Sequence, residues 1–528
     1  VYEEEFGHAR QYEWTKNSDA IVFVKFDESK VKEIIIPIYN KQLYPTEMRF
    51  KYPKAGEDNS KVSAFLYRLE GGQAKELDLS AFKNYYIPNV IQTNKADEIV
   101  LLTSHRTQNA SDVLKVNTKT GAVKKLFTET NEKWVDTDGI TLEFLEDNSF
   151  LFMSDRDGYN HLYWYDESGK VKKQVTKGNW EVTNYYGYNP KTKEIFIQST
   201  QNGSINKVIS KVNIQNGKST LISEKEGSNS ANFSNNYQYF IETSSSAQKP
   251  FTYTLKDMNG KTVKELQNNN EQLEKLKADN WVAKEYFTIP NEVGDQMNAY
   301  ILKPKNFDAS KKYPVFMFQY SGPGSQQVSN SWFNHLVQKG YLVVCVDGRG
   351  TGMKGSKFKK ITYKNLGKYE IEDQITAAKW LGKQSYVDAS RIGIFGWSFG
   401  GYMASLALTK GADVFKMGIA VAPVTNWRYY DTVYTERFLL TPQENAAGYD
   451  DNSPTTYADL LKGKFLMIHG SADDNVHYQN AVEFAEELIQ KKKQFDFMTY
   501  PDKDHGIYGG QTRPQLYQKM TDFILNNL

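Results

Sequence analysis

The sequence is short of cysteine. Cys345 is the single cysteine among 528 residues, and it lies inside an apolar run. One cysteine excludes a disulfide within the chain and a metal site built from several cysteines. Because a single thiol is compatible with oxidising and reducing surroundings alike, the redox compartment stays open.

Long runs of one residue class are also lacking. The 65 basic and 63 acidic side chains nearly cancel and form no run that follows a phosphate backbone, which argues against nucleic acid as a partner. The apolar runs, such as residues 341–346, are far shorter than the ~18–20 residues that span a bilayer, so we expect no membrane span. The chain starts at Val1 rather than at methionine, and we expect that an upstream segment has been removed.

The length of the chain predicts two domains. Single hydrophobic cores stop growing near ~250–300 residues, and this chain has 528. The residue pattern changes near position 280, where a short helix over residues 268–279 is expected to form a linker. We therefore predict one domain over residues 1–280 and a second over residues 281–528.

Residues 60–265 contain a repeated pattern. Turn glycines recur at steps of 49, 48, 48 and 43 residues, at Gly72, Gly121, Gly169, Gly217 and Gly260. Each turn joins two alternating strands and follows an earlier apolar strand, so each unit holds about four strands. Four short strands in ~40–50 residues are typical of a β-propeller blade. We predict a partial propeller of about five blades, and a row of separate β-sandwiches is the alternative.

The second half changes to a rhythm of strand, loop and helix. Continuous apolar strands are expected at residues 315–318, 341–346, 391–395, 417–420 and 465–468, and amphipathic helices at residues 370–381 and 481–491. Apolar strands separated by such helices indicate a parallel sheet that is buried on both faces.

Residues 396–400, Gly-Trp-Ser-Phe-Gly, match the G-x-S-x-G nucleophile elbow. They follow a predicted buried strand and precede a predicted helix, which is the context this motif requires. The glycines leave room for the sharp turn that lifts the hydroxyl of Ser398 above the sheet. The motif therefore predicts an α/β-hydrolase domain with Ser398 as its nucleophile.

A serine nucleophile needs a general base, and three histidines follow Ser398. His469 ends a predicted strand, where we expect it to be buried or to cap a turn. His477 follows Asp473 by only four residues, which is poor geometry for reaching both that acid and the serine. His505 is the best candidate, because the loop after the last predicted strand can fold over the elbow.

The acid that orients the histidine is expected between Ser398 and His505. Asp473 and Asp474 both lie on the loop after the strand at residues 465–468. Serine, aspartate and histidine then occur in the order that the α/β-hydrolase fold uses. Spacing alone does not separate the two aspartates.

Residues 350–355 formally match the G-x-G-x-x-G dinucleotide motif. We expect no helix to begin at these glycines, and we expect the basic residues 356–364 to be extended. We therefore interpret the motif as a tight loop at a strand end.

Taken together, these motifs resemble the prolyl oligopeptidase family along nearly the whole chain. Residues 396–402 resemble its elbow, with Phe399 where a tyrosine is usual. Residues 469–477 resemble its acid loop, whose first aspartate belongs to the triad, and this points to Asp473. Residues 320–323 resemble the segment whose tyrosine completes the oxyanion hole, so the resemblance implies that Tyr320 acts with the backbone N–H of Phe399.

The resemblance also implies how the substrate is held. Residues 421–430 and 434–437 are similar to the proline-pocket segment, and a flat aromatic slot suits a pyrrolidine ring. The implied pocket residues are Val424, Trp427, Tyr430, Tyr434, Asn475 and Val476.

Residues 1–6 resemble the glutamate motif with which dipeptide-releasing members of the family bind the free amino terminus of a substrate. The implied residues are Glu4 and Glu5. In the family a propeller segment with a substrate-binding arginine precedes this motif, and we expect that the chain is a fragment without it. Residues 39–60 resemble the arm through which family members form homodimers.

The expected activity is that of a serine exopeptidase that releases dipeptides after a penultimate proline or alanine, through an acyl-enzyme on Ser398. Peptides with a free amino terminus are the expected partners, no metal or organic cofactor is needed, and resemblance to exported bacterial members favours the periplasm. Tripeptidyl and acylaminoacyl peptidases are the enzymatic alternatives. A peptide-binding propeller beside an inactive hydrolase is the alternative from another class.

Overall fold

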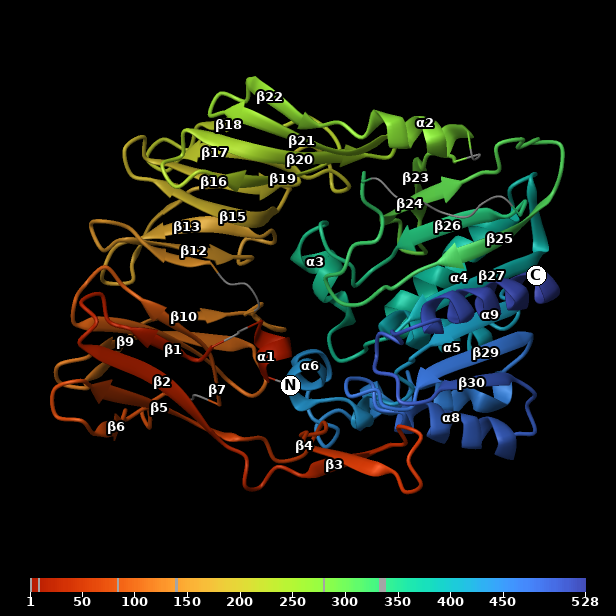
Figure 1. The fold of residues 1–528 in the computed structure, drawn as a ribbon, viewed down its shortest axis with the longest axis horizontal. Coiled ribbons are helices and arrows are strands. Elements are labelled where there is room, and N and C mark those ends of the chain that lie inside the picture. Colours follow the sequence, from red (N-terminus) through yellow and green to blue (C-terminus); the bar gives the residue numbers. More distant parts are fainter. Residues whose placement is uncertain (1, 8–9, 83–84, 138–140, 279–280, 332–338) are drawn as a thin grey trace.

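The computed structural model describes residues 2–7, 10–82, 85–137, 141–278, 281–331 and 339–528. Within these residues, the first half of the chain forms five four-stranded antiparallel sheets that follow one another along an arc (Figure 1). This arrangement confirms the predicted partial β-propeller. The predicted domain boundary at residue 280 lies outside the described residues.

The second to fifth blades are meanders of four strands that are consecutive in sequence, and the first blade has the same arrangement with an insertion between its second and third strands. The first two blades contain β1 (Tyr12–Trp14), β2 (Ala20–Asp27), β5 (Lys61–Arg68), β6 (Ala74–Glu76), β7 (Tyr86–Gln92), β8 (Glu98–Ser104), β9 (Ala110–Asn117) and β10 (Val123–Thr130). The third and fourth contain β11 (Leu142–Phe144), β12 (Phe150–Ser154), β13 (His161–Tyr165), β14 (Val171–Gln174), β15 (Val182–Asn189), β16 (Glu194–Ser199), β17 (Val208–Asn213) and β18 (Ser219–Leu221). The fifth contains β19 (Ser228–Phe233), β20 (Tyr239–Ser246), β21 (Lys249–Asp257) and β22 (Thr262–Gln267).

Alternation along each strand packs the blades face to face. In β8, Ile99 and Leu101 join a core with the first blade, whereas Val100 and Leu102 join a core with the third. Successive side chains of a strand point to opposite faces, so an inner strand of a blade that lies between two others supplies two cores. The turn glycine Gly169 has φ +89°, and a Cβ there would lie 2.7 Å from the carbonyl oxygen of Leu126, which explains the glycine at this repeat position.

A hairpin leaves the first blade between β2 and β5. It consists of β3 (Glu33–Ile38) and β4 (Thr46–Lys51), and it runs from the propeller along the lower edge of the molecule to the second domain (Figure 1). At its turn, the backbone N–H groups of Tyr39 and Asn40 donate to the carboxylate of Asp502, at 2.9 and 2.8 Å. The family-implied arm therefore contacts the second domain of its own chain.

The second half forms an eight-stranded sheet in the order β23-β24-β26-β25-β27-β28-β29-β30. Its strands are β23 (Glu285–Pro290), β24 (Gln296–Leu302), β25 (Tyr313–Phe318), β26 (Leu342–Asp347), β27 (Val387–Trp397), β28 (Met417–Val421), β29 (Lys464–Gly470) and β30 (Asp496–Tyr500). The strands from β26 to β30 are parallel, and this confirms the α/β-hydrolase fold. The antiparallel edge strands β23 and β24 are an addition that the apolar runs did not predict.

Helices cover both faces of this sheet. In β28, Ala420 faces the core that α5 and α8 share, whereas Ile419 and Val421 face the core under α9. The helices of the described residues are α1 (Tyr2–Phe6), α2 (Asn270–Ala278), α3 (Ser356–Lys359), α4 (Lys368–Gly382), α5 (Phe399–Thr409), α6 (Thr432–Leu439), α7 (Ala446–Asp450), α8 (Gln479–Gln490) and α9 (Thr512–Asn527). None of them is long and apolar enough to cross a membrane.

Two predictions about residues 350–364 were wrong. A helix does begin at the glycine motif, with Gly355 as its N-cap, and residues 356–364 are not extended. These residues form α3 and a 3₁₀ turn over Lys360–Thr362. The helical turns bury Phe358 and direct two lysines at the propeller. The ammonium of Lys359 lies 2.5 Å from the carboxylate of Asp136, and Lys360 donates to the carbonyl oxygen of Trp134 at 2.6 Å. Contacts between domains therefore select a conformation that the local sequence does not indicate.

Candidate active site

The segment around Ser398 forms a strained turn between β27 and α5. Ser398 has φ +59° and ψ −117°, a backbone conformation that non-glycine residues rarely adopt. A Cβ on Gly396 would lie 2.2 Å from the backbone of Gly400, and one on Gly400 would lie 2.6 Å from the carbonyl oxygen of Gln319. Only glycines fit these two positions, and the close approach leaves the Ser398 side chain half-buried at the end of the sheet.

His505 and Asp473 form a hydrogen-bonded pair beside this turn. Nδ1 of His505 lies 2.8 Å from Oδ2 of Asp473, which is 1% exposed. The other oxygen of Asp473 accepts the backbone N–H groups of Asn475 and Val476, at 3.1 and 2.9 Å. Sequence spacing did not distinguish Asp473 from Asp474. In the structure Asp473 makes the hydrogen bond with His505, whereas Asp474 is exposed.

The histidine loop is tied to the elbow. The indole N–H of Trp397, which adjoins Ser398, donates to the carbonyl oxygen of His505 at 3.1 Å. Because Nδ1 of His505 faces Asp473, Nε2 is the nitrogen left for the serine. The arrangement supplies a nucleophile, a base and an orienting acid from three different loops.

Electrostatics favour the charge states that such a triad needs. Burial raises the pKa of Asp473, but hydrogen bonds from His469 and His505 outweigh it and lower that pKa to about 2. Burial lowers the pKa of His505, but the hydrogen bond and the negative charge of Asp473 outweigh it, so this pKa lies above its ordinary value. At neutral pH the acid is therefore ionised and stabilises an imidazolium.

Tyr320 follows β25 and lies at the elbow. Its ring centroid is 6.0 Å from that of Phe399, the first residue of α5. Burial raises the pKa of Tyr320, and a hydrogen bond with Ser398 lowers it by less. The phenol thus stays protonated and can donate a hydrogen bond beside the serine.

Aromatic side chains form a packed cluster next to the elbow, at the position of the slot that the family resemblance implies. The rings of Trp427 and Tyr434 stack at 5.7 Å, and Tyr430 stands edge-on to both, at 5.8 and 5.4 Å. Val424 and Val476 are buried and belong to the same core. The structure therefore brings together the family-implied pocket residues from α6, the segment before it and the acid loop.

Asn475 connects this slot to the first helix of the chain. Its side-chain oxygen accepts the hydroxyl of Tyr430 at 2.6 Å, and its amide donates to the carboxylate of Glu4 at 3.2 Å. Glu4 is exposed and Glu5 is half-buried. Val1, the first residue of the glutamate motif, lies outside the described residues.

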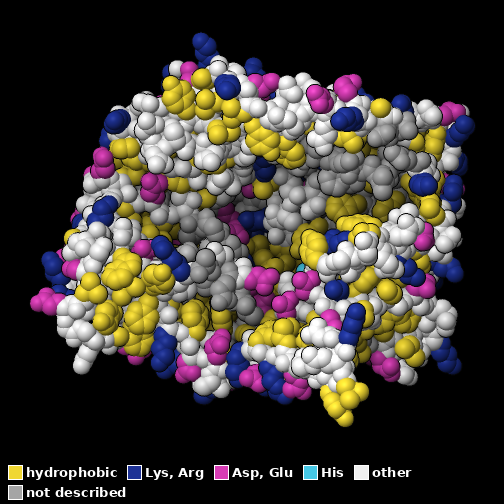
Figure 2. Space-filling model, in the orientation of Figure 1, with side chains coloured by type: hydrophobic (Ala, Val, Ile, Leu, Met, Phe, Trp, Pro, Cys, Tyr) yellow, Lys and Arg dark blue, Asp and Glu magenta, His cyan; other side chains and the backbone are white. Residues whose placement is uncertain are grey.

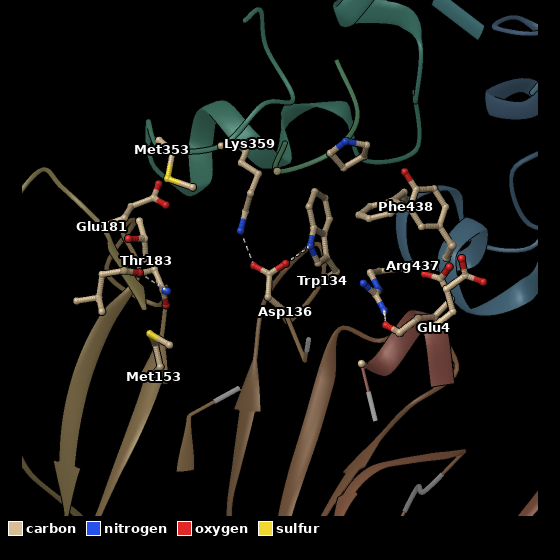
Figure 3. Close-up of a pocket in the computed structure, with 18 residues that line it drawn as sticks. Glu4, Trp134, Asp136, Met153, Glu181, Thr183, Met353, Lys359, Arg437 and Phe438 are labelled. Carbon is tan, nitrogen blue, oxygen red and sulfur yellow. Dashed lines mark hydrogen bonds and ion pairs between the residues drawn. The ribbon is translucent and has the colours of Figure 1, made fainter. Parts of the chain in front are cut away.

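Two cavities meet at Glu4. One has a volume of about 520 Å³ and is lined by Glu4, Phe50, Tyr52, Asp474, Asn475 and His505. The other, of about 440 Å³, lies between the domains, where Figure 2 shows the molecule hollowed and rich in carboxylates. Figure 3 shows Asp136 and Lys359 facing each other in this second cavity, with Glu4 and Arg437 on the side of α1.

Comparisons with known proteins match both halves of the chain. The model of the prolyl oligopeptidase family matches residues 327–528, and that of the dipeptidyl peptidase IV N-terminal region matches residues 1–251. Dipeptidyl aminopeptidase B of Saccharomyces cerevisiae is 32% identical, and the alignment covers 99% of this chain and 70% of the relative. The chain belongs to the dipeptidyl peptidase IV group of the prolyl oligopeptidase family.

Two further relatives extend this result. Probable dipeptidyl-aminopeptidase B of Arthroderma benhamiae is 33% identical, with coverage of 98% of this chain and 61% of the relative. The crystal structure of Porphyromonas gingivalis dipeptidyl peptidase 4 is 43% identical, with a TM-score of 0.97 and coverage of 100% of this chain and 76% of that chain. The chain thus spans between 61% and 76% of the length of these three relatives, all of them peptidases by name.

Within this member of the prolyl oligopeptidase family, three site residues escaped sequence reasoning. Nε2 of His469 forms a hydrogen bond with the carbonyl oxygen of Val476 at 2.7 Å and lies 3.2 Å from Oδ2 of Asp473, where it helps to lower the pKa of the acid. Trp397 is part of the elbow motif, but the sequence indicated no role for its side chain. Tyr52 comes from the arm segment and donates to the carbonyl oxygen of Asn475 at 3.3 Å. No sequence signal links Tyr52 to a loop more than 400 residues away.

His477 has a structural place in this serine peptidase. Its ring packs against that of Tyr52 at 4.2 Å, and the residue is buried. Burial lowers the pKa of His477 to about 4, so it is neutral at physiological pH. His477 ends the acid loop, and its ring packs against Phe50 and Tyr52 of the arm segment.

Proposed function

We propose that this chain acts as a serine exopeptidase that releases amino-terminal dipeptides from peptides with proline or alanine at the second position. Membership of the dipeptidyl peptidase IV group supports the class of reaction. The names of the relatives support release of dipeptides, since they are dipeptidyl peptidases. The choice of residue at the second position is inferred from the aromatic slot.

One observation carries the proposal: Glu4 and His505 line the same cavity of about 520 Å³. The α-ammonium of a peptide is positively charged near neutral pH, and a carboxylate binds it through charge-assisted hydrogen bonds. An amino terminus held at α1 leaves room for a short stretch of substrate before it reaches the histidine. The cut is then counted from the amino end.

The chemistry that we propose begins at Ser398. Its oxygen attacks the carbonyl carbon of the second substrate residue while Nε2 of His505 takes the hydroxyl proton. The carbonyl oxygen becomes an anion that accepts hydrogen bonds from the N–H of Phe399 and the hydroxyl of Tyr320. When the anion collapses, the C–N bond breaks and His505 gives its proton to the leaving amine.

The second half of the cycle repeats these steps with water. The acyl group remains as an ester on Ser398 after the shortened peptide has left. His505 takes a proton from water, whose oxygen attacks the ester carbon, and then returns that proton to the serine oxygen. The products are a free dipeptide and the regenerated enzyme.

The slot of Trp427, Tyr430 and Tyr434 supports the preference for small second residues. A flat pyrrolidine ring or a methyl group can pack against the edge of this aromatic cluster, and it buries apolar surface there without an unpaired polar group. A longer side chain meets Val424 and Val476, which are buried and close the core behind the slot.

We extend the proposal to a homodimer and to an exported protein, on the strength of the family resemblance.

A panel of chromogenic substrates tests the proposed specificity. Gly-Pro-, Ala-Ala-Pro- and acetyl-Ala-p-nitroanilide distinguish a dipeptidyl, a tripeptidyl and an acylaminoacyl peptidase. We expect the highest kcat/KM for Gly-Pro-p-nitroanilide. A preference for either other substrate rejects the dipeptidyl assignment. A fluorophosphonate probe tests the alternative of an inactive hydrolase, which would leave Ser398 unlabelled.

A further inference from the structure

Two short helices carry the two ends of the proposed substrate site, and they pack against each other. The amino-terminal α1 carries Glu4 and Glu5, and α6 carries Tyr434 of the slot. Val433 of α6 lies in one apolar cluster with Tyr2 and Phe6 of α1. The guanidinium of Arg437 donates to the backbone carbonyl oxygen of Glu5 at 3.2 Å. The position of α6 therefore sets the distance between the carboxylates and the slot.

A propeller residue, Gln108, holds this helix with both ends of its side-chain amide. Its Nε2 donates to the carbonyl oxygen of Val433 at 2.5 Å, and its Oε1 accepts Nε of Arg437 at 2.8 Å. These two residues lie one helical turn apart and flank the turn that carries Tyr434. Gln108 is fully buried, so neither bond is exchanged with solvent.

The turn that presents Gln108 is itself fixed. Gln108 has φ +52°, its N–H donates to the carbonyl oxygen of His105 at 3.0 Å, and its own carbonyl oxygen accepts the N–H of Val135 at 2.8 Å. Two residues earlier, Arg106 binds the 1% exposed Glu436 of α6 through two nitrogens, at 2.6 and 2.7 Å. A bidentate pair of this kind fixes geometry as well as charge. The propeller thus holds α6 at neighbouring points.

We propose that Gln108 is a positioning residue that sets the spacing between the amine-binding carboxylates on α1 and the proline slot on α6. This inference rests on the function proposed above. It adds the element that fixes at two the number of substrate residues between the amino terminus and the scissile bond. Gln108 lies outside the reacting groups. Its effect on the reaction is through the register of α6, which depends on a second-blade turn more than 300 residues away in sequence.

Two variants at Gln108 differ in the bonds that they keep. Gln108→Met retains the length of the side chain and removes both hydrogen bonds. Gln108→Glu keeps the acceptor for Arg437 but replaces the donor to Val433 by a carboxylate oxygen that repels the carbonyl. Gln92→Met is the matched control, because Gln92 also donates to a backbone carbonyl, that of Trp14 at 2.7 Å, far from α6.

The measurement compares kcat/KM on Gly-Pro-p-nitroanilide and Ala-Ala-Pro-p-nitroanilide with the hydrolysis of p-nitrophenyl acetate. A misplacement of ~1 Å costs on the order of 100-fold in rate, so we expect a loss of roughly 10- to 100-fold on Gly-Pro-p-nitroanilide for Gln108→Met. Gln108→Glu is expected to lose activity on this substrate as well, because its carboxylate repels the carbonyl oxygen of Val433. The ratio of tripeptide to dipeptide cleavage rises in both, while acetate hydrolysis and Gln92→Met match the wild type.

The outcomes separate this inference from the function on which it rests. An unchanged substrate ratio in both Gln108 variants overturns the positioning role and leaves the dipeptidyl activity standing. Equal losses on all three substrates also overturn it, since they indicate general damage to the fold. A wild type that prefers the tripeptide substrate contradicts both the function and the count.

Discussion

Nδ1 of His505 and Oδ2 of Asp473 lie 2.8 Å apart, although 32 residues separate them in sequence. Asp474, the next residue after the acid, is exposed. The bond fixes the tautomer of the imidazole and leaves Nε2 as the nitrogen that can accept the proton of the serine. Because only Asp473 bonds with His505, mutation of each aspartate can distinguish their roles.

Replacement of Asp473 by asparagine is expected to lower kcat by about 10⁴-fold, because an amide stabilises the wrong tautomer and no imidazolium. Asp474→Asn changes the side chain equally and serves as the control, with a small expected effect. The kcat on Gly-Pro-p-nitroanilide measures both. Equal losses in the two variants would falsify the assignment of the acid.

The dependence of kcat/KM on pH follows from His505. The raised pKa means that the imidazole is still largely protonated at pH ~6.5, its ordinary value, and a protonated imidazole is no base. Activity is therefore expected to rise with pH through a midpoint above ~6.5, for Gly-Pro-p-nitroanilide and for p-nitrophenyl acetate alike. A midpoint below this value on both substrates contradicts the account of His505.

Tyr320→Phe removes the proposed second donor of the oxyanion hole. Loss of one such donor costs ~10²–10³-fold in kcat, and we expect a value in this range with KM little changed. Tyr508→Phe is the matched control, since Tyr508 is 63% exposed. If kcat of Tyr320→Phe equals that of the control, the hydroxyl has no part in stabilising the anion.

Glu4→Gln and Glu5→Gln test the binding of the substrate amine. Each removes a negative charge from α1 and keeps the size of the side chain, so we expect kcat/KM on Gly-Pro-p-nitroanilide to fall roughly 10- to 100-fold. Glu76→Gln, on an exposed strand of the first blade, is the control. Hydrolysis of p-nitrophenyl acetate should stay at the wild-type rate in all three. Wild-type values for both α1 variants would remove the amine anchor.

Local sequence patterns predicted the parts of the fold that depend on local rules. The glycine period gave the blades because each blade repeats one hairpin with a left-handed turn, as at Gly121 and Gly169. The elbow at Ser398 was predictable for a similar reason. Its glycines are required by close contacts within the turn itself and with the end of one neighbouring strand. The loop position of His505 followed from the order of strands.

Features that depend on contacts between distant segments were not predictable. Residues 356–364 were predicted to be extended from their local sequence. In the structure Lys359 lies in a helical turn and pairs with Asp136 of the propeller. The sequence indicated only a buried or turn-capping histidine at position 469. Its proximity to Asp473 depends on the fold of the acid loop. Tyr52 reaches the acid loop from the arm, and no periodicity or spacing records that contact. Such contacts need the tertiary structure, because their partners share no local pattern.

The central claim is that the enzyme counts from a charged amino terminus, and blocking that amine tests it most directly. Gly-Pro-p-nitroanilide and acetyl-Gly-Pro-p-nitroanilide present the same scissile bond to Ser398 and differ in the charge that meets Glu4 and Glu5. We predict efficient cleavage of the free substrate and a fall in kcat/KM of at least about 100-fold for the acetylated one, since the charge pair with the α1 carboxylates is lost and an uncharged group faces both of them. Equal kcat/KM values for the two substrates would contradict the account.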